Sequence, residues 1–187
     1  LADETGRSDD AREALLRSEG RALDVTRGAV VTSPHTARRV EDLFGIPRDR
    51  IRVAIPGTDP APPAEGPTAE DPPLLLCVGS VIPRKGHDVL IAALGRLRGR
   101  SWRMVCVGSL TADPEYADEV QRRSRRAGIE DRIRFTGSVS EADLHQMYHS
   151  SSIFVLPSHY EGYGMSLAEA MARGIPIVST TGGAIPD

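Results

Sequence analysis

Two glutamates, Glu161 and Glu169, stand eight positions apart around a glycine turn. The short apolar run at residues 153–156 predicts a buried parallel strand before the turn, and Gly162 and Gly164 allow the backbone to bend tightly before a helix begins. Such a strand–turn–helix unit directs backbone N–H groups and the positive end of the helix dipole toward the carboxyl edge of a sheet, where phosphorylated ligands usually bind. The two carboxylates can therefore accept hydrogen bonds from the hydroxyl groups of one ligand.

A pair of cations lies in a second turn of this kind. Lys85 is the only lysine among the 23 basic residues, and it stands between Arg84 and Gly86 at a predicted strand-to-helix junction. Cations at the start of a helix are unfavourable for its dipole, so we expect this pair to bind a phosphate or diphosphate; two solvated charges are the alternative. The order of residues fits neither the Walker P-loop nor the glycine-rich dinucleotide motif.

Strands and helices are predicted to alternate after residue 73. We expect strands at 74–79, 103–107, 132–135, 153–156 and 175–179, with helices near 87–97, 115–127, 141–150 and within the glutamate run. Five strands separated by four helices require a parallel sheet covered on both faces. The sequence therefore predicts a doubly wound, Rossmann-like α/β fold.

The composition divides the chain into three parts. For residues 1–57, the sequence predicts too few helices and strands for an independent α/β domain. Residues 58–73 are expected to be an extended linker, because six of the fourteen residues from 60 to 73 are proline. Residues 74–187 are expected to form the doubly wound domain, and we expect the chain to be part of a larger protein that extends beyond both ends.

Helices and short strands are predicted within the first part. Asp9 and Asp10 can cap a helix that runs to about residue 27. Ser33 is expected to be the N-cap of the next helix, with Pro34 at its first position. This helix is expected to end at Gly45 and to turn Val40, Leu43 and Phe44 inward. Strands are expected before and after it, at 29–31 and 51–55.

The overall composition, 40% hydrophobic and 26% charged, is ordinary for a globular protein. A net charge of -3 gives no reason to expect nucleic acid as a partner, and the arginines at 122, 123, 125 and 126 are expected to be a solvated helix end. Apolar runs are too short to span a bilayer and no signal peptide is recognised, so we expect a cytoplasmic protein. Arginine in place of nearly all lysine indicates a GC-rich genome.

Cysteine and histidine give little indication of a metal site. Cys77 and Cys106 lie in separate apolar strands without a nearby His or Cys partner, so we expect small, reduced core residues. His145 and His149 have the spacing of a zinc pair, but a surface pair is favoured because no third ligand accompanies them. His87 is ambiguous between a substrate contact and a packing role.

The run from 157 to 174 resembles the E-x7-E signature of retaining glycosyltransferases of group 1 (family 4), which have the two-domain GT-B fold. Residues 79–90, with their Arg-Lys-Gly, resemble the strand-to-helix turn of this family, and residues 135–139 resemble a later glycine turn. Residues 55–59 are similar to the segment that leaves the N-terminal domain, although Gly57 directly follows Pro56 where many relatives have Asn. The resemblance covers about residues 29–187 and implies a donor-binding domain with the end of an acceptor-side domain.

The resemblance also implies a role for each matching residue. Glu169 would bind the ribose hydroxyls of a nucleotide-sugar donor, and Glu161 would contact the sugar at the reacting centre. Arg84 and Lys85 would hold the diphosphate and stabilise its charge as the donor breaks. The donor site would be completed by Gly79, Ser80, Gly137, Val139, Gly162, Gly164, Met165, Ser166 and Leu167. No Asp-x-Asp motif is present to bridge a metal, and no cofactor is implied besides the donor substrate.

The expected function is metal-independent transfer of a sugar from a nucleoside-diphosphate sugar to an acceptor, with retention of configuration. This chain alone is expected to bind nucleotide without catalysing transfer. The acceptor, a glycan, a lipid or a small molecule, is not specified, and peripheral membrane contact through the rest of the N-terminal domain stays open. A sugar-nucleotide epimerase or phosphorylase of the same fold, or a non-catalytic nucleotide-binding module, are the alternatives.

Overall fold

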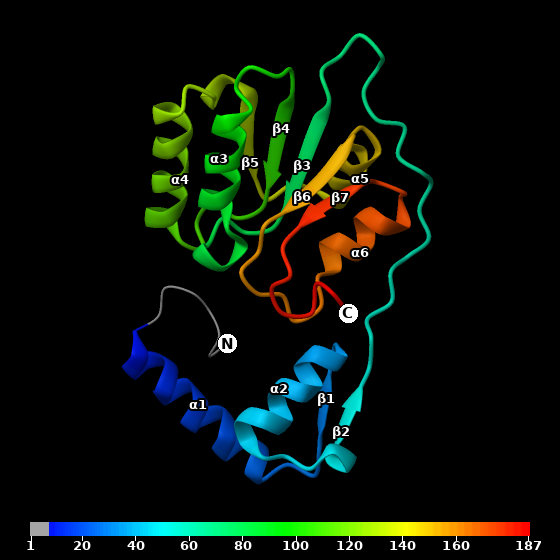
Figure 1. Ribbon diagram of the computed structural model, residues 1–187. Coiled ribbons are helices and arrows are strands. Elements are labelled where there is room, and N and C mark those ends of the chain that lie inside the picture. Colours follow the sequence, from blue (N-terminus) through cyan, green and yellow to red (C-terminus); the bar gives the residue numbers. More distant parts are fainter. Residues whose placement is uncertain (1–7) are drawn as a thin grey trace. The chain divides into compact units, whose positions relative to one another are not determined.

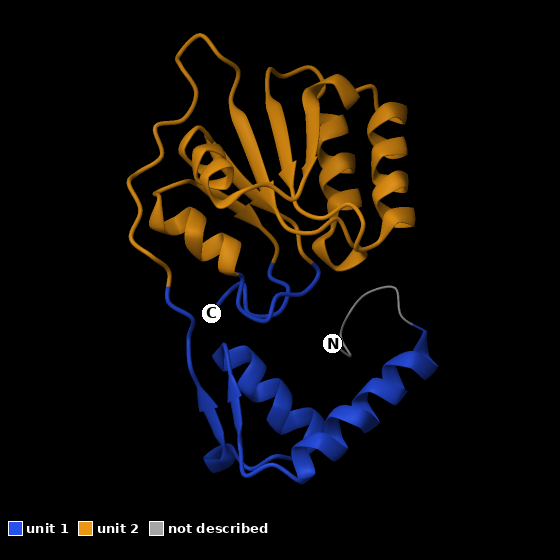
Figure 2. Ribbon diagram, turned by 180° about the vertical axis from the view of Figure 1, so that it is seen from behind, with its two compact units in different colours: residues 1–57, 159–164, 181–187 blue, residues 58–158, 165–180 orange. Residues whose placement is uncertain are grey.

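The computed structural model describes residues 8–187, which form two compact units (Figures 1 and 2). Of the described residues, unit 1 comprises 8–57, 159–164 and 181–187, and unit 2 comprises 58–158 and 165–180. The turn at 159–164 therefore makes its contacts chiefly within the unit that holds the first part of the chain. The domain boundaries expected from composition stay predictions.

Unit 2, every residue of which is described, has the predicted doubly wound fold. Its parallel strands lie in the order β5-β4-β3-β6-β7: β3 Leu74–Val78, β4 Arg103–Val107, β5 Ile133–Gly137, β6 Ile153–Leu156 and β7 Ile177–Ser179. The chain adds β4 and β5 on one side of β3 and then returns to add β6 and β7 on the other side. The strand order thus reverses between β3 and β6, and ligands of such sheets bind at this switch point.

Helices cover both faces of this sheet. They are α3 His87–Arg96, α4 Pro114–Arg126, α5 Glu141–His149 and α6 Met165–Ala172. Figure 1 shows α3 and α4 on one face and α5 and α6 on the other, as right-handed crossovers on the two sides of β3 require. The ends of these helices and strands differ from the predicted ends by no more than two residues.

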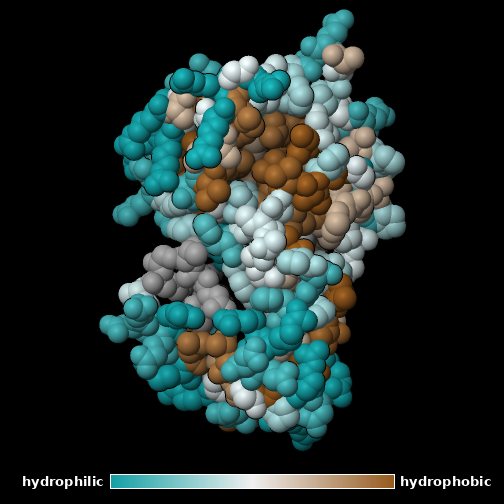
Figure 3. Space-filling view, viewed as in Figure 1, coloured by the Kyte–Doolittle hydropathy of each residue, from teal (hydrophilic) through white to brown (hydrophobic). Residues whose placement is uncertain are grey.

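The core of unit 2 lies between the sheet and its helices. Leu76, Met104, Phe154 and Leu156 are at most 1% exposed, and each such side chain stabilises the fold by roughly 1.5–3 kcal/mol. Figure 3 shows hydrophobic side chains gathered over the strands of unit 2 and hydrophilic ones over α4. The arginine-rich end of α4 is a polar helix end, as predicted, with Arg122, Arg123 and Arg126 all paired with Glu119.

Cys77 and Cys106 are buried and free, as predicted, but the prediction that they have no partner is wrong. They lie opposite each other on β3 and β4, and Sγ of Cys77 is 3.7 Å from Nε2 of the buried His87. The hydrogen bond from Cys106, together with His87, lowers the pKa of Cys77, and the same contact and burial raise the pKa of Cys106. Strand pairing brings the two cysteines together, so their spacing in the sequence could not reveal that contact.

In unit 1, a small parallel sheet packs against helices. The elements are α1 Asp9–Asp24, β1 Ala29–Val31, α2 Pro34–Phe44, a short 3-10 turn Arg48–Arg50 and β2 Ile51–Val53. Val31, Ala37, Ile46 and Ile51 form the core, and Val40 and Phe44 pack against it as predicted. Leu43 does not face inward, because it is 36% exposed.

The capping residues of α2 are those predicted, whereas the N-cap of α1 differs from the prediction. Ser33 Oγ accepts a hydrogen bond from Thr36 N, Pro34 begins α2, and Gly45 ends it in the left-handed conformation, all as predicted. For α1, however, the N-cap is Ser8, whose hydroxyl accepts a hydrogen bond from Ala11 N. Asp9 and Asp10 instead occupy the first turn, where their negative charges interact favourably with the positive end of the helix dipole. None of the described helices has the length and the apolar character that a membrane span requires.

Candidate functional site

The loop after β3 contacts the residue that directly follows β6 at the carboxyl edge of the sheet in unit 2. Pro83–Lys85 form a short 3-10 turn (η2), and Gly86, with φ of 68°, joins this turn to α3. A side chain at Gly86 would clash with the carbonyl oxygen of Pro157, which directly follows β6. Glycine is required here both for the left-handed dihedral and for the close approach. The Arg-Lys-Gly sequence thus places its cations at the switch point of the sheet.

Lys85 packs against the backbone at the end of β3. Its Cδ and Cε lie 3.3 and 3.2 Å from the position that a Cβ of Gly79 would occupy, so the small residue leaves room for the lysine chain. The N–H of Gly79 continues the sheet by donating to Val107 O at 2.8 Å. Gly79, Ser80, Arg84 and Lys85 therefore belong to one loop after β3.

The first turn of α6 provides backbone donors beside β6. The N–H groups of Met165, Ser166 and Leu167 lie at the amino end of this helix, where no residue of the same helix can accept their hydrogen bonds. Helix amino ends of this kind bind phosphate groups well. Glu169 lies one turn further along α6, and its Oε2 accepts a hydrogen bond of 2.8 Å from the hydroxyl of Tyr148.

Gly137 and Val139 follow the carboxyl end of β5. Gly137 has φ of 71° and accepts a hydrogen bond of 3.0 Å from Gly108 N, so it ends the strand in a tight turn. Val139 is half-buried in the loop that leads to α5. Since β4 separates β5 from β3, these residues lie at the same edge of the sheet as Lys85 but further from the switch point.

Glu161 belongs to the turn at 159–164 in unit 1. Its N–H donates to Gly182 O at 3.3 Å, and its carbonyl accepts a hydrogen bond of 2.7 Å from Ala184 N. Gly183 has φ of 69°, and a side chain there would clash with the backbone of Glu161. Glu161 is only 6% exposed. The turn at 181–187 therefore fixes the backbone of this glutamate.

The amino end of α2 fixes the same turn from another direction. The hydroxyls of Thr32 and Thr36 donate to Gly162 O at 3.3 and 3.1 Å, and the hydroxyl of Tyr163 donates to Pro56 O at 3.1 Å. Neither threonine was predicted to contact the turn, because their only signal in the sequence is a pair of hydroxyl residues beside the predicted N-cap. The glycine that follows Glu161 is thus held by residues from the first part of the chain.

The predicted site residues are divided between the two units. Unit 2 contains the cations, the backbone donors of α6 and Glu169, whereas unit 1 contains Glu161, Gly162 and Gly164. Within unit 2, the structure brings the loop of Lys85 and the exit of β6 into contact. The roles assigned to these residues stay proposals.

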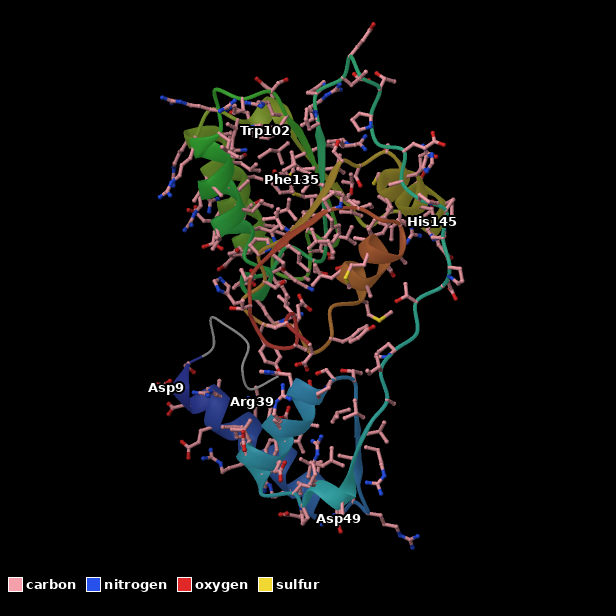
Figure 4. The ribbon with its side chains drawn as sticks, turned by 45° about the vertical axis from the view of Figure 1, so that its right-hand side comes forward. Asp9, Arg39, Asp49, Trp102, Phe135 and His145 are labelled. Carbon is pink, nitrogen blue, oxygen red and sulfur yellow. The ribbon has the colours of Figure 1, made fainter. Side chains whose placement is uncertain are left out.

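The linker at 58–73 is attached to the ends of α5 and α6. Ala64 N donates to Arg173 O at 2.9 Å, and the N–H groups of Glu65 and Gly66 both donate to His149 O. Nε2 of His149 lies 3.4 Å from the Glu65 carboxylate, and Nε2 of His145 lies 3.9 Å from that of Glu141. His145, labelled in Figure 4, lines a groove of about 410 Å³ beside the linker. Each histidine therefore has its own carboxylate neighbour.

Residues 61–187 match the family described as "Glycosyl transferases group 1". The chain belongs to this family. It is 30% identical over 183 residues to a D-inositol 3-phosphate glycosyltransferase of Xylanimonas cellulosilytica, with 89% of this chain and 43% of that protein covered. It is 27% identical over 193 residues to a GDP-mannose-dependent alpha-(1-6)-phosphatidylinositol monomannoside mannosyltransferase of Mycobacterium tuberculosis, with 93% and 48% covered.

The fold of this group 1 chain is similar to that of solved glycosyltransferase structures. The crystal structure of HepE from Anabaena in complex with UDP and glucose superposes with a TM-score of 0.81 at 20% identity, covering 92% of this chain and 49% of that one. This similarity agrees with the prediction from the motifs that the chain forms one half of a two-domain GT-B fold. The chain spans less than half the length of these three proteins.

Proposed function

We propose that the protein transfers a sugar from a nucleoside-diphosphate sugar to an acceptor, with retention of configuration, and that unit 2 holds the donor nucleotide. One observation carries this proposal: the loop with Arg84 and Lys85 after β3 lies against the exit of β6, which leads to α6 and Glu169. Cations and a helix amino end thus occur at the switch point where α/β sheets bind ligands. Family membership favours sugar transfer over the epimerase, phosphorylase and non-catalytic alternatives.

Lys85 and Arg84 would bind the diphosphate together with the N–H groups at the start of α6. When the bond between the anomeric carbon and the diphosphate breaks, negative charge develops on the β-phosphate oxygen. Fixed cations and amide donors stabilise that charge without reorganising, which lowers the barrier. Because the protein itself supplies this positive charge, we propose a reaction that does not depend on a metal ion.

The two glutamates would hold the sugar-containing parts of the donor. Glu169, on α6, would accept hydrogen bonds from the ribose hydroxyls, and a hydrogen bond to a charged group is worth about 1.5–3 kcal/mol. Glu161 would contact the donor sugar and help to orient its anomeric carbon. The acceptor is not specified by this chain.

Titration calorimetry of this chain with UDP, GDP and ADP tests the proposal. We expect one of the three diphosphates to bind with an affinity that EDTA does not change, and we expect no sugar transfer by the chain alone. Loss of binding in EDTA would contradict metal independence. A folded sample that binds none of the three would contradict the proposed function.

A further inference from the structure

Tyr148 connects the candidate ribose-binding glutamate to the core of unit 2. Its side chain, on α5, is only 1% exposed, and its hydroxyl lies 2.8 Å from Oε2 of Glu169 and 3.2 Å from Ser166 O. A tyrosine hydroxyl has one proton to donate, and the carboxylate is both the nearer and the charged acceptor. The hydroxyl proton therefore goes chiefly to Glu169.

The ring of Tyr148 contacts an aromatic ring and a guanidinium group. The ring of Phe154 stacks on it with a centroid distance of 5.9 Å and an interplanar angle of 19°. The guanidinium carbon of Arg173 lies 4.6 Å from the ring centroid, and Nη1 of Arg173 donates to Glu169 O at 2.8 Å. Arg173 thus contacts both the ring of Tyr148 and the backbone of Glu169. Because the hydroxyl oxygen is bonded to the ring, contacts that hold the ring also hold the hydroxyl group.

Tyr148 stays protonated and can therefore donate a hydrogen bond at all times. Burial, together with the negative charge of Glu169, raises the pKa of Tyr148, so the phenol keeps its proton at physiological pH. One lone pair of the carboxylate is thereby occupied before any ligand arrives. The remaining lone pairs can still accept hydrogen bonds from a diol.

We propose that Tyr148 is a positioning residue for ribose recognition: it fixes the orientation of the Glu169 carboxylate before the nucleotide binds. This inference rests on the proposed function, in which Glu169 binds the ribose hydroxyls. A glutamate side chain loses rotamer freedom when it binds a ligand, and holding it in advance removes part of that loss. Arg173 supports the arrangement by clamping the ring and the backbone of α6.

The variant Tyr148→Phe tests this role because it removes only the hydroxyl and keeps the stacked ring. The ligands are the diphosphate that the wild type binds among UDP, GDP and ADP, and the 2′,3′-dideoxy form of that diphosphate. We expect Tyr148→Phe to weaken the ribose form about three- to tenfold and to leave the dideoxy form nearly unchanged. In Tyr148→Phe/Glu169→Ala, we expect no loss beyond that of Glu169→Ala.

Tyr116→Phe is a matched control. The Tyr116 hydroxyl donates to Oδ1 of Asp88 at 2.7 Å, which is the same kind of hydrogen bond between α4 and α3. We expect Tyr116→Phe to have the wild-type ratio between the affinity for the diphosphate and the affinity for its 2′,3′-dideoxy form. If Tyr148→Phe proves too unstable to titrate, Arg173→Gln removes the clamp, and we expect it to lower the same ratio.

The outcomes separate this inference from the proposed function. An equal loss for both ligands in Tyr148→Phe, or no loss for either, would overturn the positioning role and leave nucleotide binding in place. Equal wild-type affinities for the two ligands would overturn the ribose role of Glu169 and this inference with it. A wild type that binds none of the three diphosphates would overturn both proposals.

Discussion

Gly86 lies against the carbonyl oxygen of Pro157, so the loop after β3 and the exit of β6 are in direct contact. The left-handed dihedral of Gly86 lets the chain turn from η2 into α3 without a side chain at this contact. The loop that carries Arg84 and Lys85 is thereby held against the carboxyl end of β6 within unit 2. This contact is the structural basis for placing the two cations at the switch point of the sheet.

We expect Gly86→Ala to destabilise unit 2. The substitution combines a dihedral that costs an alanine about 1–2 kcal/mol with a clash against backbone, so the loss should be at least about 2 kcal/mol. For a chain of this size, that corresponds to a fall in melting temperature of roughly 4–8 °C. Gly99→Ala is the control, since Gly99 has open space around it, and it should change the melting temperature little. Equal melting temperatures for the two variants would show that the contact is not as tight as described.

We expect Lys85→Ala to weaken diphosphate binding and to spare nucleoside binding. Removing a charged hydrogen bond to phosphate should reduce the affinity for the nucleoside diphosphate about ten- to a hundredfold. The free nucleoside carries no phosphate, so its affinity should not change. Arg96→Ala, at the other end of α3, is the control for a lost positive charge. A similar loss for diphosphate and nucleoside would argue against a phosphate contact by Lys85.

We expect Thr36→Val to loosen the turn that holds Glu161. The hydroxyl of Thr36 donates to Gly162 O, and one such bond contributes about 0.5–1.5 kcal/mol. Hydrogen exchange of the Glu161 amide should therefore be about two- to tenfold faster in this variant. Thr26→Val removes a hydroxyl bond to Leu23 O at the end of α1 and should leave that amide unchanged. Unchanged exchange in Thr36→Val would mean that other contacts alone hold the turn.

Local signals in the sequence predicted much of the fold. The apolar strands 103–107 and 153–156 have the predicted bounds, and Ser33, Pro34 and Gly45 define α2 as expected. The alternation of strands and helices was sufficient to predict a parallel sheet covered on both faces. These features depend on neighbours within a few residues, which a single chain displays directly.

Contacts between distant residues were not predictable from these signals. Tyr148 and Glu169 are 21 positions apart, and Thr36 and Gly162 are 126 apart, so neither hydrogen bond has a local pattern. Cys77 and Cys106 meet only through strand pairing. The exposed Leu43 shows the same limit, because helical spacing does not specify how wide the covered face is. The motifs thus predicted the candidate site, whereas its supporting contacts required the structure.

The most direct test of the account is the affinity of Glu169→Ala for the nucleoside diphosphate that the wild type binds, measured by titration calorimetry. Glu130→Ala, which changes an exposed glutamate in the 3-10 turn Glu130–Arg132, is the control. We predict that Glu169→Ala weakens binding about ten- to a hundredfold while Glu130→Ala binds like the wild type. Wild-type affinity in a folded Glu169→Ala protein would contradict the assignment of the donor nucleotide to this site.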